Sequence, residues 1–334
     1  MENLLFALGA VAPLILTAVL GYVLRRVGWY PLSLAAPVNR LVFRVFLPIL
    51  LFLNIYNIDD PGTIEPGYLI YAAVAILLFF FLGIPLSMWI TKDPARRGPV
   101  LQCVFRSNYA LIGIPLATSL FGTEGSITAS LLCALTIPMF NILAVISLSV
   151  FRPRTEGDTP AMRGKIASIL RGVAKNPLIH GILLGLLTLA LRALFVRHGI
   201  TFRLSSVTPV YTLLKNLSAL ATPLALLVLG VQFDFHAVPG MKREILAAVL
   251  LRTVLVPAAG LGAALLFFPG VFSGSHYAAL VALFATPVAV SSVPMAQEMG
   301  ADAPLAGQLV LFTTLASGVT MFAFSYALRL LGIF

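Results

Sequence analysis

The chain has 334 residues, of which 60% are hydrophobic and only 10% are charged. A soluble domain carries about 25% charged residues, so this composition excludes one and indicates a chain embedded in lipid. The net charge of +10 does not indicate a nucleic-acid partner, because lysine and arginine gather in short segments between apolar stretches and not along one helix face.

Ten apolar stretches follow one another, each near the roughly 20 residues that a helix needs to cross a bilayer. The first is expected to be a span and not a signal peptide, because Glu2 precedes it and no basic residue does. We therefore predict an all-α membrane protein with ten transmembrane helices, at residues 4–24, 36–55, 68–91, 100–120, 127–150, 177–196, 208–232, 244–268, 276–297 and 304–332.

The basic residues predict how the chain lies in the membrane. Alternate loops hold most of them: Arg25, Arg26, Lys92, Arg96, Arg97, Arg152, Arg154, Arg163, Lys165, Arg171, Lys175, Lys242 and Arg243. The opposite loops hold Arg192, Arg197, Arg203, Arg329 and the acidic turn of Asp59, Asp60 and Glu65. Because basic loops stay in the cytoplasm, we expect a multi-pass protein of the cell (inner or plasma) membrane with both termini on the outer side.

Three spacings recur, in the same order, in the two halves of the chain. They pair Pro13-Leu14-Ile15 and Leu20-Gly21 with Pro177-Leu178-Ile179 and Leu184-Gly185, Arg40 and Pro48 with Lys215 and Pro223, and Phe105 and Pro115 with Phe284 and Pro294. Each half has an odd number of spans, so the second copy enters the membrane from the opposite side. We predict two inverted five-helix repeats, residues 1–151 and 176–334, joined by a basic cytoplasmic loop, residues 152–175.

The fourth and ninth spans carry helix breakers at matching positions. Pro115 and Pro294 each remove a backbone donor, and Gly113 adds flexibility to the first site. Backbone groups freed in this way line a cavity or meet a ligand, and paired breaks indicate a transport site at the midplane. Half-helix N-termini there favour an anion. The alternative is that these prolines only kink packed helices.

The candidate substrate-binding residues are the polar side chains and breakers around these two sites, together with two amides elsewhere in the membrane. They are Arg106, Ser107, Asn108, Gly113, Ile114, Pro115, Pro287, Ser291, Ser292, Pro294, Asn54 and Asn141. Two alternatives stay open: Arg106 can instead extend to the cytoplasmic surface, and the two amides can simply bridge helices.

Glu298, Asp234 and Arg252 are candidates for coupling transport to a cation, because charges inside a membrane are usually functional. Asp234 and Arg252 are expected near the same face, where they can pair, and Glu298 is alternatively a solvated loop carboxylate. The scattered histidines have no metal-binding spacing, and Cys103 and Cys133 are expected to be apolar fillers. No metal site and no cofactor is predicted.

The run Asn108-Tyr109-Ala110-Leu111-Ile112-Gly113-Ile114-Pro115-Leu116, with ten spans and a basic middle loop, resembles the auxin efflux carrier family. That family includes plant auxin exporters and bacterial permeases assigned to malate or malonate. It is similar in fold to sodium/proton antiporters and bile-acid symporters, so the resemblance implies that the fourth and ninth helices are broken and cross at the substrate site. It places Asn108, Pro115 and Pro294 at the crossover. The chain departs from the plant carriers in its short middle loop and in Pro287, which stands where the first repeat has Asn108.

The sequence thus predicts a secondary active transporter of a small organic anion: a mono- or dicarboxylate, or an auxin-like acid. A bundle with the two broken helices is expected to move against a scaffold of spans one, two, six and seven, as in an elevator. An enzyme is not expected, because no intramembrane catalytic arrangement is evident. The alternatives are a membrane sensor with a transporter fold and a cation-coupled symporter of another amphipathic acid. Substrate, direction, a coupling proton or sodium ion, and assembly as a homodimer are left open.

Overall fold

In the computed structural model, residues 2–57, 66–151, 174–198 and 202–334 are described, and all the regular structure in them is helical. The first half contains α1 (Glu2–Val27), η1 (Leu32–Leu34), α2 (Ala35–Leu41), η2 (Val42–Phe46), α3 (Leu47–Tyr56), α4 (Pro66–Ile90), α5 (Pro94–Phe105), η4 (Tyr109–Gly113) and α6 (Ile114–Val150). The second half contains α8 (Pro177–Arg197), η5 (Leu204–Ser206), α9 (Thr208–Gln232), η6 (Phe235–Met241), α10 (Lys242–Leu250), η7 (Leu251–Leu255), α11 (Val256–Phe267), α12 (Gly274–Ala285), α13 (Ser292–Glu298) and α14 (Ala303–Leu330).

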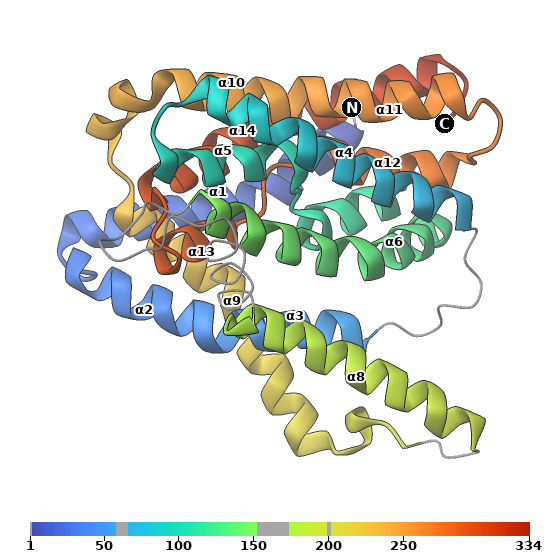
Figure 1. The fold of residues 1–334 in the computed structure, drawn as a ribbon, viewed down its shortest axis with the longest axis horizontal. Helices are drawn as coiled ribbons and strands as arrows, with labels where there is room; N and C mark the ends of the chain where they lie inside the picture. Colours follow the sequence, from blue (N-terminus) through green and yellow to red (C-terminus); the bar gives the residue numbers. More distant parts are fainter. Residues whose placement is uncertain (1, 58–65, 152–173, 199–201) are drawn as a thin grey trace, which may run out of the picture.

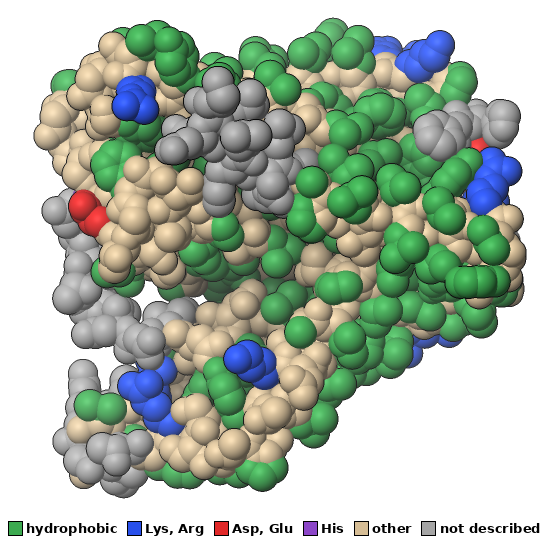
Figure 2. Space-filling model, turned by 180° about the vertical axis from the view of Figure 1, so that it is seen from behind, with side chains coloured by type: hydrophobic (Ala, Val, Ile, Leu, Met, Phe, Trp, Pro, Cys, Tyr) green, Lys and Arg blue, Asp and Glu red, His purple; other side chains and the backbone are tan. Residues whose placement is uncertain are grey.

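Helices lie at every predicted span. Among the described residues, seven helical stretches are long and apolar enough to cross a membrane: 32–56, 67–90, 94–150, 177–196, 208–232, 238–267 and 303–330. Figure 2 shows hydrophobic side chains over much of the face that it draws. The chain is therefore a multi-pass membrane protein. The acidic turn and residues 152–173 of the basic loop lie outside the described residues.

The stretch 94–150 contains the fourth and fifth predicted spans, which a sharp turn separates. Phe121 and Gly122 leave the helical conformation inside α6, and Gly122 has φ +56° and ψ −138°. A positive φ favours glycine, because residues with a side chain rarely adopt it. The turn takes two residues, which is tighter than the six-residue gap that the hydropathy pattern predicted.

The helices pack in two groups. In the first, α1 lies against α9, and α3 lies against both α8 and α9; with α2 they form what we call the scaffold. In the second, α4, α5, α6, α10, α11, α12, α13 and α14 form what we call the bundle. Figure 1 shows α2, α3, α8 and α9 along one side of the molecule, with α4, α10, α11 and α12 on the other.

Glycines set the closest approaches within the scaffold. A Cβ atom added to Gly21 of α1 would collide with the carbonyl oxygen of Leu227 in α9. One added to Gly185 of α8 would lie 2.9 Å from Ile55 Cβ and 3.2 Å from Phe52 O in α3. Small residues let backbones approach in this way, which is how helices gain packing energy in lipid.

Replacing Gly21 by alanine is expected to lower thermal stability in detergent, because the added methyl group forces α1 away from α9. Overpacking of this kind costs about 1–3 kcal/mol. Gly262→Ala in α11 is the matched control, since its Cβ would meet no atom within 4 Å. A Gly21→Ala protein that unfolds at the same temperature as this control would contradict the close contact.

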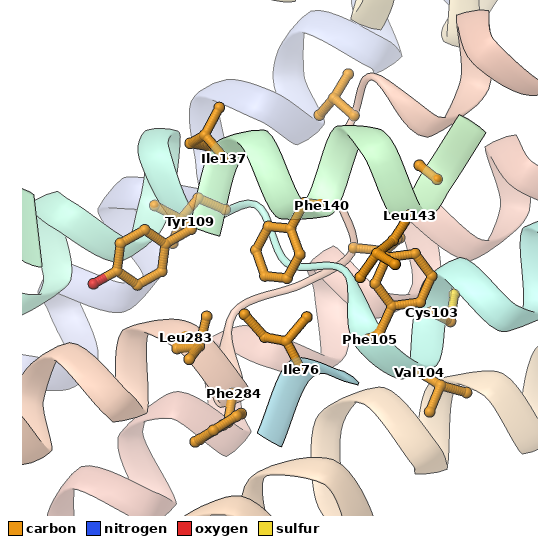
Figure 3. Packing of buried hydrophobic residues seen from close by; sticks show 14 of the residues in the cluster. Ile76, Cys103, Val104, Phe105, Tyr109, Ile137, Phe140, Leu143, Leu283 and Phe284 are labelled. Carbon is orange, nitrogen blue, oxygen red and sulfur yellow. The ribbon is translucent and has the colours of Figure 1, made fainter. Parts of the chain in front are cut away.

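The centre of the bundle is a buried aromatic core. Figure 3 shows Phe105 at the end of α5, Phe140 of α6 and Phe284 near the end of α12 converging around Ile76 of α4. The ring centroids of Phe105 and Phe140 are 6.4 Å apart. Phe105, Phe140, Phe284 and Ile76 are all buried. This core places the ends of α5 and α12 close to each other inside the protein.

Candidate functional site

The first interruption lies between α5 and η4. The helix stops at Phe105, Arg106 has an extended conformation, and helical turns resume at Tyr109. The prediction that Gly113 and Pro115 break this span was therefore wrong in position.

A π turn, and not a break, accompanies Pro115. The π turn η4 ends directly before the Ile114-Pro115 start of α6. The same order occurs where η2 precedes Pro48 and where η7 precedes Pro257. Proline lacks an N–H and its ring pushes against the carbonyl four residues earlier, so the turn widens while the helix continues.

The second interruption lies between α12 and α13. The helix ends at Ala285, the segment 286–291 is not helical, and α13 begins at Ser292. Pro287 lies within this break. Pro294 lies in the first turn of α13, where proline is tolerated, so it is not the breaker that we predicted.

A backbone hydrogen bond joins the two interruptions. The amide of Asn108 donates to the carbonyl of Pro287 over 2.7 Å. Next to it, the Val288 amide is 3.3 Å from the Thr313 hydroxyl of α14. The two breaks therefore lie against each other in the interior and satisfy part of each other's backbone.

A pocket lies between these breaks and the scaffold, with about 620 Å³ of empty space, part of it open to solvent. The bundle contributes Arg106, Ser107, Asn108, Tyr109, Ala110, Leu111, Ile137, Phe140, Asn141, Ala289, Val290 and Ser291. The scaffold contributes Leu47, Leu50, Leu51 and Asn54 of α3, Leu178 of α8, and Ala221, Thr222 and Ala225 of α9. Among the described residues that line the pocket, Arg106 carries the one formal charge and none is a carboxylate.

Arg106 is held between the two breaks by neutral groups. Its Nη2 donates to Asn141 Oδ1 at 2.9 Å and to Ser291 Oγ at 2.7 Å, and its Nη1 donates to Gln102 Oε1 at 2.8 Å. Ser292 Oγ, at 3.3 Å, and a methionine sulfur complete the surroundings. The residue is 2% exposed, which excludes the alternative that it extends to the membrane surface.

The charge of Arg106 has no acidic partner in the described part of the chain. The C-terminal end of α5, immediately before it, offsets part of this charge. Burial of a guanidinium without a carboxylate is nevertheless costly. Arg106 is thus a buried positive charge at the pocket whose printed hydrogen-bond partners are all neutral.

Three residues of the pocket lining, Ser107, Asn108 and Tyr109, have a buried side-chain polar atom with no hydrogen-bond partner among the described residues. Ser107 Oγ and Asn108 Nδ2 are buried and form no hydrogen bond to any described residue. Each unpaired buried group costs about 1–3 kcal/mol unless something satisfies it. Ser107 and Asn108 directly follow Arg106 in the chain and line the pocket with it.

The structure gathers part of the predicted substrate site. Arg106, Ser107, Asn108, Asn54, Asn141 and Ser291 line the pocket, whereas Gly113, Ile114, Pro115, Pro287, Ser292 and Pro294 do not. Gly113 instead lets η4 pack on α12, because a Cβ there would lie 3.2 Å from Ala282. Pro115 is exposed on the surface of the bundle.

The coupling candidates lie away from the pocket. Glu298 Oε2, at the end of α13, is 3.9 Å from Arg40 Nε of α2. Asp234 is exposed beyond the end of α9. The expected pair of Asp234 and Arg252 is not formed: both lie in the described residues, and the Arg252 guanidinium is directed at three backbone carbonyls of the α12 end instead.

Apart from Asn54, the residues of the scaffold wall of the pocket were not predicted. Leu47, Leu178 and Thr222 each adjoin a proline of the recurring pattern, namely Pro48, Pro177 and Pro223. The recurring sequence pattern could therefore have indicated this wall, because its prolines adjoin lining residues.

The family of the chain follows from comparison with known proteins. The model of a family described as "Membrane transport protein" matches residues 6–325. The chain belongs to this membrane transport protein family. It is the auxin efflux carrier family that the fourth-span motif indicated. A relative from Methanothermobacter thermautotrophicus, described as an uncharacterized transporter, is 22% identical over 314 residues, which are 93% of this chain and 95% of the relative.

Asn141→Ala is expected to destabilise the protein more than Asn108→Ala. Asn141 accepts from Arg106 and donates to the Ile137 carbonyl, so its loss leaves a buried charge less satisfied. Hydrogen bonds to charged groups contribute about 1.5–3 kcal/mol, whereas the Asn108 amide nitrogen has no partner to lose. Thermal unfolding in detergent compares the two variants. Equal destabilisation by both would indicate that Asn108 is structural.

Proposed function

We propose that this chain is a secondary carrier of small organic anions and that its substrate binds between the two helix breaks. The observation that carries this proposal is the buried Arg106 guanidinium, which lines the pocket with neutral partners alone. A carboxylate would supply the missing counter-charge, and Ser107 and Asn108 would donate to its oxygens. Membership of a transport family supports the view that such a ligand is carried across the membrane and not only bound.

The proposed substrate is an amphipathic acid with one carboxylate. Arg106 is the cation of the pocket lining, so a second carboxylate would have no charged partner there. The facing wall is formed by Leu47, Leu50 and Leu51 of α3 with Leu178 of α8, which suits an apolar body. We therefore rank monocarboxylates with an apolar group above dicarboxylates.

We further propose ten membrane spans arranged as two inverted repeats, residues 1–151 and 176–334. The scaffold contacts support this duplication. Gly21 and Gly185 hold equivalent positions in the recurring sequence pattern. Their partners Leu227 and Phe52 each lie four residues after a proline of the pattern. The contact that Gly21 of the first half makes with the second half is therefore equivalent to the contact that Gly185 of the second half makes with the first.

Such a repeat gives a physical route to alternating access, in which the bundle moves against the scaffold. At one end of the molecule the two groups are in polar contact: Glu298 meets Arg40, and Gln232 Nε2 of α9 donates to Gln297 Oε1 of α13. Figure 2 shows a hollow between the groups on the side away from α13. With basic loops in the cytoplasm and both termini outside, this conformation corresponds to a site closed toward the cytoplasm.

A sensor that kept the transporter fold is the second candidate. The same pocket would serve a sensor, because ligand recognition does not require release on the opposite side. Ligand binding without flux would distinguish it from a carrier.

Asn108→Ala and Arg106→Gln are expected to reduce uptake of a labelled organic acid into proteoliposomes by about 10-fold or more, because each removes a donor to the carboxylate. The assay uses a panel of mono- and dicarboxylates with imposed proton and sodium gradients. Asn57→Ala and Arg243→Gln are the matched controls, since both residues lie at helix ends away from the pocket. Unchanged uptake in Asn108→Ala would remove that residue from the site.

Glu298→Gln is expected to change the rate of uptake by no more than about 5-fold, because an ion pair at the surface is worth about 1 kcal/mol or less. Arg40 is 61% exposed in this pair. The exchanged double variant Arg40→Glu with Glu298→Arg should recover the wild-type rate. Loss of gradient-driven accumulation in Glu298→Gln, with exchange of substrate preserved, would instead assign Glu298 to coupling.

A further inference from the structure

The C-terminal end of α12 is an unusual place for a helix to stop. Its last residues, including Leu283, Phe284 and Ala285, are buried in the bundle core (Figure 3). The final turn of any helix leaves carbonyls without intrahelical donors, and it carries partial negative charge. Inside a membrane protein these carbonyls need another partner.

Arg252 donates most of the hydrogen bonds that these carbonyls accept. Its Nη2 donates to the carbonyls of Leu283 and Phe284, each at 2.9 Å, and its Nε donates to the carbonyl of Thr286 at 2.8 Å. The Thr286 hydroxyl donates to the Ala282 carbonyl at 2.8 Å. The negative end of α12 is thus covered by one cation and one hydroxyl.

The position of Arg252 is fixed by its own helix. It lies in the π turn η7, which precedes Pro257, and it is 1% exposed. The described residues contain no carboxylate within ion-pair distance of it. Its positive charge is therefore balanced by the helix end and not by an acidic side chain.

Converging carbonyls at the end of a half-helix are the type of site at which transporters with broken helices bind a coupling cation. Here a guanidinium holds those oxygens. Arginine stays protonated in proteins and is covalently attached, so it cannot be released to either side of the membrane.

We propose that Arg252 is a built-in cation that takes the place of a coupling sodium ion at the end of α12, so that the carrier moves its substrate without sodium. This inference rests on the proposed carrier function. It assigns Arg252 a positioning role: the residue keeps the α12 end, and with it the Pro287 carbonyl that receives the Asn108 amide, in place beside the pocket.

The test uses the purified full-length chain in detergent and measures thermal unfolding in sodium, potassium, choline and methylguanidinium chlorides at equal ionic strength. The wild type is expected to unfold at the same temperature in sodium, potassium and choline. Arg252→Ala is expected to unfold at a lower temperature and to be restabilised by methylguanidinium or sodium relative to choline. Arg243→Ala, at the start of the same helical span, should show no such cation response.

Specific stabilisation of the wild type by sodium would overturn the proposal, and so would an Arg252→Ala protein that folds but responds to no cation. If Arg252→Ala does not fold, Arg252→Lys replaces it: the retained charge should keep the wild-type indifference to sodium, and a sodium-specific rise would contradict the proposal.

Uptake into proteoliposomes gives the second readout. Wild-type flux of an accepted acid should be the same, within about 2-fold, with a sodium or a potassium gradient, and accumulation driven by sodium would overturn the inference. Absence of flux for every acid would count against the carrier function alone, because the unfolding measurements still decide the role of Arg252.

Discussion

Peptide groups inside a membrane protein have no water to bind, and two helices of this chain nevertheless stop and restart there. The Asn108 amide and the Pro287 carbonyl satisfy each other across the two interruptions. Arg252 covers the end of α12, and Arg106 stands at the end of α5. The bundle is arranged around this requirement, and the pocket is the space left where the two interruptions face the scaffold.

The two buried arginines differ in what surrounds them. Arg252 is directed at a helix end whose partial charge balances it, and it does not line the pocket. Arg106 lines the pocket and has neutral side chains as partners. The charge of Arg252 is therefore balanced by the protein's own backbone, whereas that of Arg106 has no acidic partner among the described residues.

The sequence predicted the helices well because apolar length alone determines them. It predicted the breaks less well, because Pro115 and Pro294 were taken to interrupt the helices that contain them. At Pro115 a preceding π turn absorbs the missing hydrogen bond, whereas the interruption at Ser107 and Asn108 contains no proline at all. The arrangement of Arg106 and Arg252 was not predictable either, since neither local spacing nor hydropathy tells which distant carbonyl or amide a buried guanidinium meets.

The contacts of the scaffold have a consequence for how the protein is made. Helix α1 is synthesised first, yet Gly21 lies against Leu227 and the carbonyl of Ala18 lies against Gly230, both about 200 residues later in α9. The nascent α1 must therefore remain in the bilayer without this partner while most of the chain is still on the ribosome. Assembly of the scaffold is in this sense a late event in biogenesis, and the bundle helices α4 to α6 can associate before it.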